Sequence, residues 1–171
     1  MAKKSKLRTQ SFRWQDPALT AVAAQRLSGL EFLQSMAAGK LPLPPIAVLM
    51  NVQSLEVEPG RVVFVATPGE CHYNPIGMVH GGFAATLLDS AMACAVHSQL
   101  PLGQSYTTLE VKTHFVHAMT ADTGPVRVEG EVLHLGNRVA TAEGRILDRR
   151  GKLYAHGSTT CLVFPGGQSH G

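Results

Sequence analysis

The chain has 171 residues, 44% of them hydrophobic and 16% charged, with a formal net charge of +3. These values are typical of one globular domain and exclude an intrinsically disordered chain. The net charge is too small to indicate a nucleic-acid-binding protein, and no nucleic-acid-binding motif is present. No apolar run is long enough to span a membrane. The low charged fraction indicates that other subunits cover part of the surface.

The three cysteines are Cys71, Cys94 and Cys161. Their number is odd, and their spacing is not that of a metal site. They are therefore interpreted as free thiols in a reducing compartment, which predicts a cytoplasmic protein.

Residues 1–43 are predicted to precede the main domain in three parts. The run MAKKSKLR indicates a solvated basic tail. Asp16 and Pro17 suit the first positions of a helix, apolar residues follow at roughly helical spacing, and Gly39 ends the pattern. This predicts one amphipathic helix of about six turns. The proline-rich stretch LPLPP then predicts an extended linker.

Residues 44–164 are predicted to form the main domain, followed by a flexible tail at 165–171. Strand-like runs separated by turn-forming residues lie on either side of one helix, which occupies the second half of residues 74–96. The order is strand, strand, helix and four strands, which predicts an α+β fold with a long antiparallel sheet and one helix on its face. The predicted strands are 46–57, 61–67, 104–117, 126–135, 138–148 and 152–164.

Asp89 is the most informative residue in the sequence. It is the only Asp, Glu, Lys or Arg between Cys71 and Leu109, and it lies inside a helix that is apolar on every side. Such a helix is expected to be buried. A buried acid costs stability unless it is paired, so the pattern favours a carboxylate that lines a cavity and acts as base or nucleophile. The alternative is a structural Asp satisfied by hydroxyl or amide groups.

The tripeptide His80-Gly81-Gly82 precedes this helix. Glycine allows another group to approach the backbone closely, and free N–H groups at a helix N-terminus can hold an oxygen that gains negative charge. On its own a Gly-Gly pair is more often a tight turn. With an acid on the same helix, it predicts an oxyanion site.

The spacing of the two features predicts a dimer. Asp89 follows Gly82 by seven residues, about 10 Å along a helix axis. A base must lie within about 3 Å of the atom it serves, or act through one water. The two groups would therefore cooperate only between helices of different subunits, in two composite sites.

The run Asn74-Pro75-x-Gly77-x-x-His80-Gly81-Gly82, with Asp89 seven positions later, resembles the hotdog-fold acyl-CoA thioesterases, especially the phenylacetate-pathway type. In a hotdog fold the sheet wraps around a central helix, and the resemblance spans about residues 44–164. It implies hydrolysis of acyl-CoA, with CoA as part of the substrate and no separate cofactor. It also implies a homodimer as the catalytic unit and a homotetramer as the assembly.

The resemblance also implies roles for individual residues. Gly82 would polarise the thioester carbonyl through its N–H, with His80 and Gly81 shaping the turn. Asn74 would lie near the thioester or the attacking water, and Asp89 of the partner would be base or nucleophile. The remaining implied residues are Thr108, which would orient water, Thr107, which would replace it if the register slips by one, and Arg138, which would contact the nucleotide.

The acyl pocket is expected to use apolar residues, with Phe83, Leu88 and Met92 as candidates. No metal site is predicted, because no HExxH motif occurs and His114 and His117 would point to opposite faces of a strand. Two alternatives stay open. One is a non-catalytic protein that binds acyl-CoA. The other is an enoyl-thioester hydratase or dehydratase, although position 93, one turn after Asp89, is alanine rather than the histidine that such a site needs.

Overall fold

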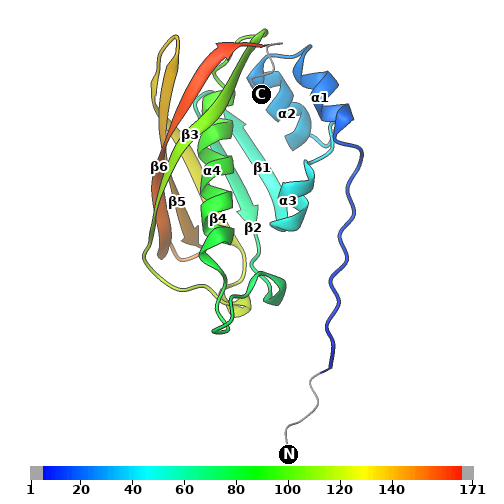
Figure 1. Cartoon of the computed structure of the whole chain (residues 1–171), viewed down its shortest axis with the longest axis vertical. Helices are drawn as coiled ribbons and strands as arrows, with labels where there is room; N and C mark the ends of the chain where they lie inside the picture. The colour runs from blue at the N-terminus through cyan, green and yellow to red at the C-terminus, as the bar shows by residue number, and fades with distance from the viewer. Residues whose placement is uncertain (1–5, 167–171) are drawn as a thin grey trace, which may run out of the picture.

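A computed structural model describes residues 6–166 of the chain, and the outer parts of both predicted tails, 1–5 and 167–171, lie outside the described residues. Its centre is one antiparallel sheet of six strands in the order β1-β2-β4-β5-β6-β3 (Figure 1). The strands are β1 (Val52–Glu58), β2 (Arg61–Ala66), β3 (Gln104–Phe115), β4 (Val126–Leu135), β5 (Val139–Asp148) and β6 (Leu153–Pro165). The α+β prediction is confirmed, with one long antiparallel sheet and a long helix along one of its faces. The last four predicted strands agree with β3 to β6 within two residues at each end.

The central helix α4 (Gly81–His97) connects β2 to β3 and lies along one face of the sheet. Its sheet-facing side is fully buried and includes Leu88, Ala91 and Met92. Close approach depends on glycine, since a Cβ placed at Gly130 of β4 would lie 2.3 Å from the carbonyl oxygen of Ala91. The helix is therefore held against the sheet at backbone distance, which fixes the rotation of α4 about its axis.

The opposite side of α4 is not buried, so the prediction of a helix covered on every side is wrong for the single chain. Ala85, Thr86, Asp89 and Ser90 are all partly exposed along this side. The sequence shows only that the residues of this helix have low polarity. Low polarity does not show whether another part of the same chain covers them. An apolar or small side chain stays apolar whether the surface above it is protein from the same chain or not.

The N-terminal region contains three short helices, α1 (Ala18–Ala24), α2 (Gly29–Ala37) and α3 (Pro45–Leu49), where one long helix and a strand were predicted. The predicted six-turn helix is interrupted at Ser28, whose side chain caps α2 in a capping box with Glu31. Gly29 packs directly on the carbonyl oxygen of His97, which a Cβ would approach to 1.7 Å. The chain therefore begins a new helix at Gly29, where it also contacts His97, instead of continuing one helix through this point.

Residues 45–49 form α3, so the predicted strand at 46–57 begins only at Val52. Pro45 occupies the first helical position, where its missing N–H costs nothing, and this favours one helical turn over an extended start. Two short 3-10 helices, η1 (Glu70–His72) and η2 (Ala121–Thr123), complete the described elements. The C-terminal boundary is also later than predicted, because Pro165 still belongs to β6 and Gly166 donates its N–H to the carbonyl of Gly103 at 2.7 Å.

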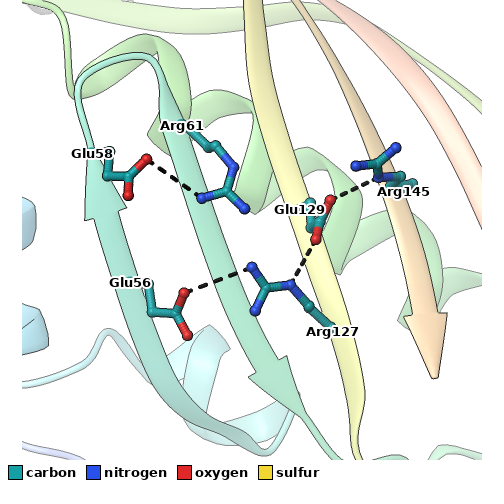
Figure 2. A network of polar contacts seen from close by, with 6 residues as sticks. All are labelled: Glu56, Glu58, Arg61, Arg127, Glu129 and Arg145. Atoms are coloured by element: carbon teal, nitrogen blue, oxygen red, sulfur yellow. Dashed lines mark hydrogen bonds and ion pairs between the residues drawn. The ribbon is translucent and has the colours of Figure 1, made fainter. Parts of the chain in front are cut away.

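A network of ion pairs crosses the outer face of the sheet (Figure 2). Glu129 lies at its centre, with side-chain exposure of only 13%, and accepts hydrogen bonds from Arg127 at 2.6 Å and Arg145 at 2.7 Å. Partial burial raises the pKa of Glu129, but the hydrogen bonds and charges of the two arginines outweigh this effect and leave the pKa below its ordinary value. The network joins neighbouring strands on the side of the sheet away from α4.

Candidate active site

Asp89 lies in the middle of α4, on the side of the helix that faces away from the sheet. The hydroxyl of Thr108, on β3, donates a hydrogen bond to Oδ1 of Asp89 at 3.0 Å. The structure therefore brings together, within a single chain, two residues to which the resemblance gave separate catalytic roles. Because the Thr108 proton is used on the carboxylate, the lone pairs of its oxygen remain able to accept a hydrogen bond from water.

Both residues line a cavity of about 540 Å³, which falls within the usual range of about 300–1,000 Å³ for small-molecule sites. Thr107, the other predicted strand residue, also lines it. The cavity extends from Asp89 toward the N-terminal region, which supplies much of its apolar wall. The residues contributed by that region are Leu33, Met36, Leu43, Pro44, Ile46, Ala47 and Met50.

The ionisable groups beside Asp89 are held in their neutral forms. Burial, together with the charge of Asp89, raises the pKa of the Cys94 thiol to about 12. Burial also raises the pKa of Tyr106 well above its usual value, with further contributions from Cys94, Cys161 and Asp89. A thiol with such a pKa is almost entirely protonated at neutral pH and is a poor nucleophile. Among the groups that line this cavity, the carboxylate of Asp89 is thus the one suited to act as base or nucleophile.

A second group of predicted residues gathers at the N-terminal end of α4. His80 is the N-cap, and its Nδ1 accepts the N–H of Gly82 at 2.8 Å. Asn74 holds the preceding turn, because its Oδ1 accepts the N–H groups of Ile76 and Met78, each at 3.1 Å. The Gly82 N–H and the Asn74 carbonyl oxygen, both predicted to serve the substrate, therefore also have structural partners within the chain.

This end of the helix opens onto a different cavity, of about 380 Å³, lined by Asn74, His80, Gly81 and Phe115 among others. A Cβ at Gly81 would lie 3.0 Å from the ring of Phe115, so glycine keeps the backbone accessible here. Between the two cavities a shallower hollow of about 430 Å³ runs along α4 and β3 and includes Asp89. The two groups of predicted site residues therefore lie in different cavities along a single helix.

The remaining predicted substrate-binding residues lie elsewhere. Leu88 and Met92 are fully buried against the sheet, because they lie on the side of α4 opposite to the cavity. Phe83 packs on the ring of His72, with ring centroids 4.5 Å apart. Arg138 is exposed in the turn before β5. None of these four side chains lines the cavity beside Asp89.

Sequence reasoning missed three polar residues of this cavity, Ser90, Cys94 and Tyr106. Helical spacing could have found the first two, since Ser90 and Cys94 are four residues apart and adjoin Asp89 on one side of α4. Strand alternation could have found Tyr106, which is two residues before Thr108 and shares its face of β3. The N-terminal wall carried no comparable signal.

Within residues 6–166, no three or more His, Cys, Asp or Glu side chains are grouped so that they could hold a metal ion. In the same residues, none of the helices is both long and apolar enough to cross a membrane.

Comparison with known proteins shows similarity to thioesterases. Residues 76–155 match the family model described as Thioesterase superfamily. A 1,4-dihydroxy-2-naphthoyl-CoA hydrolase from Listeria monocytogenes is 24% identical over 114 residues, which is 67% of this chain and 91% of that protein.

Two solved structures share the fold. A phenylacetic acid degradation-related protein from Ralstonia eutropha superposes with a TM-score of 0.67 at 26% identity, covering 76% of this chain and 98% of that one. A Streptococcus mutans protein bound to acetyl CoA superposes with a TM-score of 0.61 at 20% identity, covering 67% and 90%. The fold is that of the hotdog thioesterases. The enzyme class that the matches support is acyl-CoA thioesterase.

Proposed function

We propose that the protein hydrolyses an acyl-CoA thioester to a free acid and CoA in two composite sites of a homodimer. Asp89 of one subunit and the N-terminus of α4 of the other, with Gly82, would form each site. One observation carries this proposal. Asp89 lines one cavity, whereas His80 and Gly81 line another, and Asp89 follows Gly82 by seven residues, about 10 Å along the helix axis. The proposed base and the proposed oxyanion donor of one chain would therefore be too far apart to act on the same thioester.

The free surfaces of the chain support an antiparallel pairing of α4 with its copy. Ala85 and Thr86 lie midway between Gly82 and Asp89 and are partly exposed. A two-fold axis near them would bring each Gly82 opposite the other subunit's Asp89. The small residues on this side allow the helices to approach closely. The adjacent strand β3 is at an edge of the sheet and has only β6 as its neighbour within the described residues, so it could pair with its copy.

The chemistry follows from the groups in place. Water would be oriented by the oxygen of Thr108 and give a proton to Asp89 while it attacks the thioester carbon. The carbonyl oxygen would gain negative charge near the positive end of α4. There the His80 side chain would either release the Gly82 N–H or share it with this oxygen. The C–S bond would then break, and the departing CoA sulfur would take up the proton that Asp89 had accepted from the water, which regenerates the carboxylate. In the nucleophilic variant Asp89 itself attacks and water hydrolyses the anhydride.

Finer features of the substrate, the binding site and the assembly belong to the same proposal. The similarity to a protein related to phenylacetic acid degradation favours a substrate of that type, and the acetyl-CoA-bound fold neighbour favours acyl-CoA as the ligand. Arg138 would contact the CoA phosphates as an exposed cation. The assembly would be a cytoplasmic homotetramer made of two such dimers.

The composite site can be tested by mixing two inactive variants, Asp89→Asn and Gly82→Pro. Proline removes the N–H of Gly82 at a position in the first helical turn, where proline is tolerated. A mixed dimer would contain one site with both defects and one site with neither. Random exchange of subunits should therefore restore about a quarter of wild-type activity, because about half of the dimers are mixed and each has one intact site.

Release of free thiol from a panel of aromatic and aliphatic acyl-CoAs is the readout. Each variant alone and wild type mixed with wild type are the controls. No recovery in the mixture, with exchange verified by differently tagged subunits, would place both groups in the same subunit and contradict the composite site. A wild-type protein that binds acyl-CoA but releases no thiol would refute hydrolysis and favour the binding protein.

A further inference from the structure

The cavity beside Asp89 has two chemically different walls. The wall from the N-terminal region, β1 and β2 consists of apolar side chains such as Leu33, Met50 and Phe64. The wall from α4 and β3 also carries three polar side chains besides the Asp89–Thr108 pair and Thr107, namely Ser90, Cys94 and Tyr106. An apolar body therefore fits one side of the cavity, and hydrogen-bonding groups are available on the other.

The hydroxyls of Tyr106 and Ser90 have no hydrogen-bond partner within residues 6–166. They are not sealed in the core, because the only buried side-chain atom without a partner in those residues is Oγ1 of Thr67. Neighbouring hydroxyls behave differently, since Thr108 donates to Asp89 and Thr159 donates to the carbonyl of Glu110. Two unpaired hydroxyls thus face the space that a ligand would fill.

Aromatic contacts hold the ring of Tyr106 in place. It packs on the imidazole of His97, with ring centroids 5.2 Å apart, and His97 in turn packs on Phe32 of α2. The hydroxyl is therefore presented from a fixed ring, so little side-chain entropy is lost when it binds a ligand. Phenylalanine at this position would keep the ring contacts and lack only the hydroxyl, so the hydroxyl is the group available to a ligand.

We propose that Tyr106, assisted by Ser90, determines the acyl specificity by binding a neutral hydroxyl or oxo substituent on an otherwise apolar acyl group. The proposal rests on the proposed function, since it places the acyl group in the Asp89 cavity. The substituent would be neutral because the carboxylate of Asp89 lines the same space and repels a second negative charge. Tyr106 stays protonated, as its raised pKa requires, and can both donate and accept a hydrogen bond.

Matched substrates that differ by one hydroxyl test this inference. The four substrates are phenylacetyl-CoA, 4-hydroxyphenylacetyl-CoA, hexanoyl-CoA and 6-hydroxyhexanoyl-CoA. In at least one pair wild type should prefer the hydroxylated member in kcat/KM by about tenfold or more, since a site built to bind a hydroxyl discriminates against the analogue that lacks it. Tyr106→Phe should abolish that preference by lowering kcat/KM for the hydroxylated member alone, and Ser90→Ala should reduce it less.

Tyr154→Phe is the matched control, because the phenolic hydroxyl that it removes does not line the Asp89 cavity and instead donates to Oδ2 of Asp148 at 3.4 Å. It should leave the ratio between paired substrates unchanged. Equal losses on both members in Tyr106→Phe, or a wild type without preference in either pair, would overturn the role of Tyr106 while leaving hydrolysis intact.

Dissociation constants for the same four thioesters, measured by calorimetry, separate this inference from the proposed function. If wild type hydrolyses none of them but binds a hydroxylated member more tightly in a Tyr106-dependent manner, hydrolysis is refuted and the specificity role stands. If neither hydrolysis nor binding depends on the hydroxyl, the specificity role is refuted.

Discussion

The N-terminal end of α4 and the middle of α4 differ in how their polar groups are paired. At the N-terminal end, the carbonyl oxygen of Asn74, the Nδ1 of His80 and the N–H of Gly82 are bonded to one another or to the adjoining turn. In the middle of the helix, Asp89 has one hydroxyl partner and lies beside unpaired hydroxyls in a cavity. At the N-terminal end the polar groups are therefore paired within the chain, whereas in the middle of the helix some of them are left for a ligand.

The comparison predicts its largest effect at Asp89. Asp89→Asn keeps the shape and an acceptor for Thr108 but removes the negative charge. We expect kcat to fall by about a hundredfold or more, the usual weight of a general base. Thiol release from acyl-CoA, with substrate binding measured in parallel, checks this. Retained turnover in the variant would make Asp89 a structural residue.

A smaller effect in stability, with no effect on chemistry, is expected from the outer face of the sheet. Glu129→Gln should lower the free energy of unfolding by about 1–3 kcal/mol at neutral pH, because two arginines lose a charged partner. The pKa of Glu129 is lowered in the folded protein. Its contribution is therefore complete above the ordinary glutamate pKa and is lost as the pH falls through the lowered value.

Urea unfolding of wild type and Glu129→Gln at several pH values measures that difference. The two curves should converge in acid, and kcat per folded molecule should be unchanged at neutral pH. A stability difference that persists unchanged in acid would show that the charge of Glu129 is not what stabilises the sheet.

Thr108 tests the paired hydroxyl in the middle of α4, because it donates a hydrogen bond from β3 to the carboxylate of Asp89. Thr108→Val removes the hydroxyl but keeps the shape, and we expect kcat to fall by roughly tenfold through loss of water orientation. Thr108→Ser should restore most of the activity. Equal activity of the valine and serine variants would remove Thr108 from the mechanism.

The smallest expected effect is at His80, the N-cap of α4. His80→Ala should destabilise the protein by about 1 kcal/mol, the usual cost of losing an N-cap, whereas His80→Asn should keep the cap. If the role of His80 is positional, the activity of the asparagine variant should stay close to wild type. Thermal unfolding and thiol release measure the two effects separately. A stable but inactive asparagine variant would show that the imidazole itself contacts the substrate.

The described fold could be predicted well where local patterns decide it. Strands β3 to β6 follow from alternation and from turn residues such as those around Gly124 and Gly151. The N-terminal region was predicted poorly because competing local signals were close in energy. Apolar spacing across Ser28 fits a continuous helix, yet the capping box and the contact of Gly29 with His97 favour a break.

For the site, the sequence by itself determined which side chains could carry chemistry, because a lone carboxylate in an apolar helix is anomalous in any fold. It also determined that Asp89 and Gly82 are about 10 Å apart, since helical rise is constant. Only the tertiary structure decided which side of α4 meets the sheet. That choice depends on where Gly130 allows contact, and it directs Leu88 and Met92 into the core and Ser90 and Cys94 toward the cavity. Tyr106 and the N-terminal wall join Asp89 only through contacts between residues far apart in the chain, which no local pattern encodes.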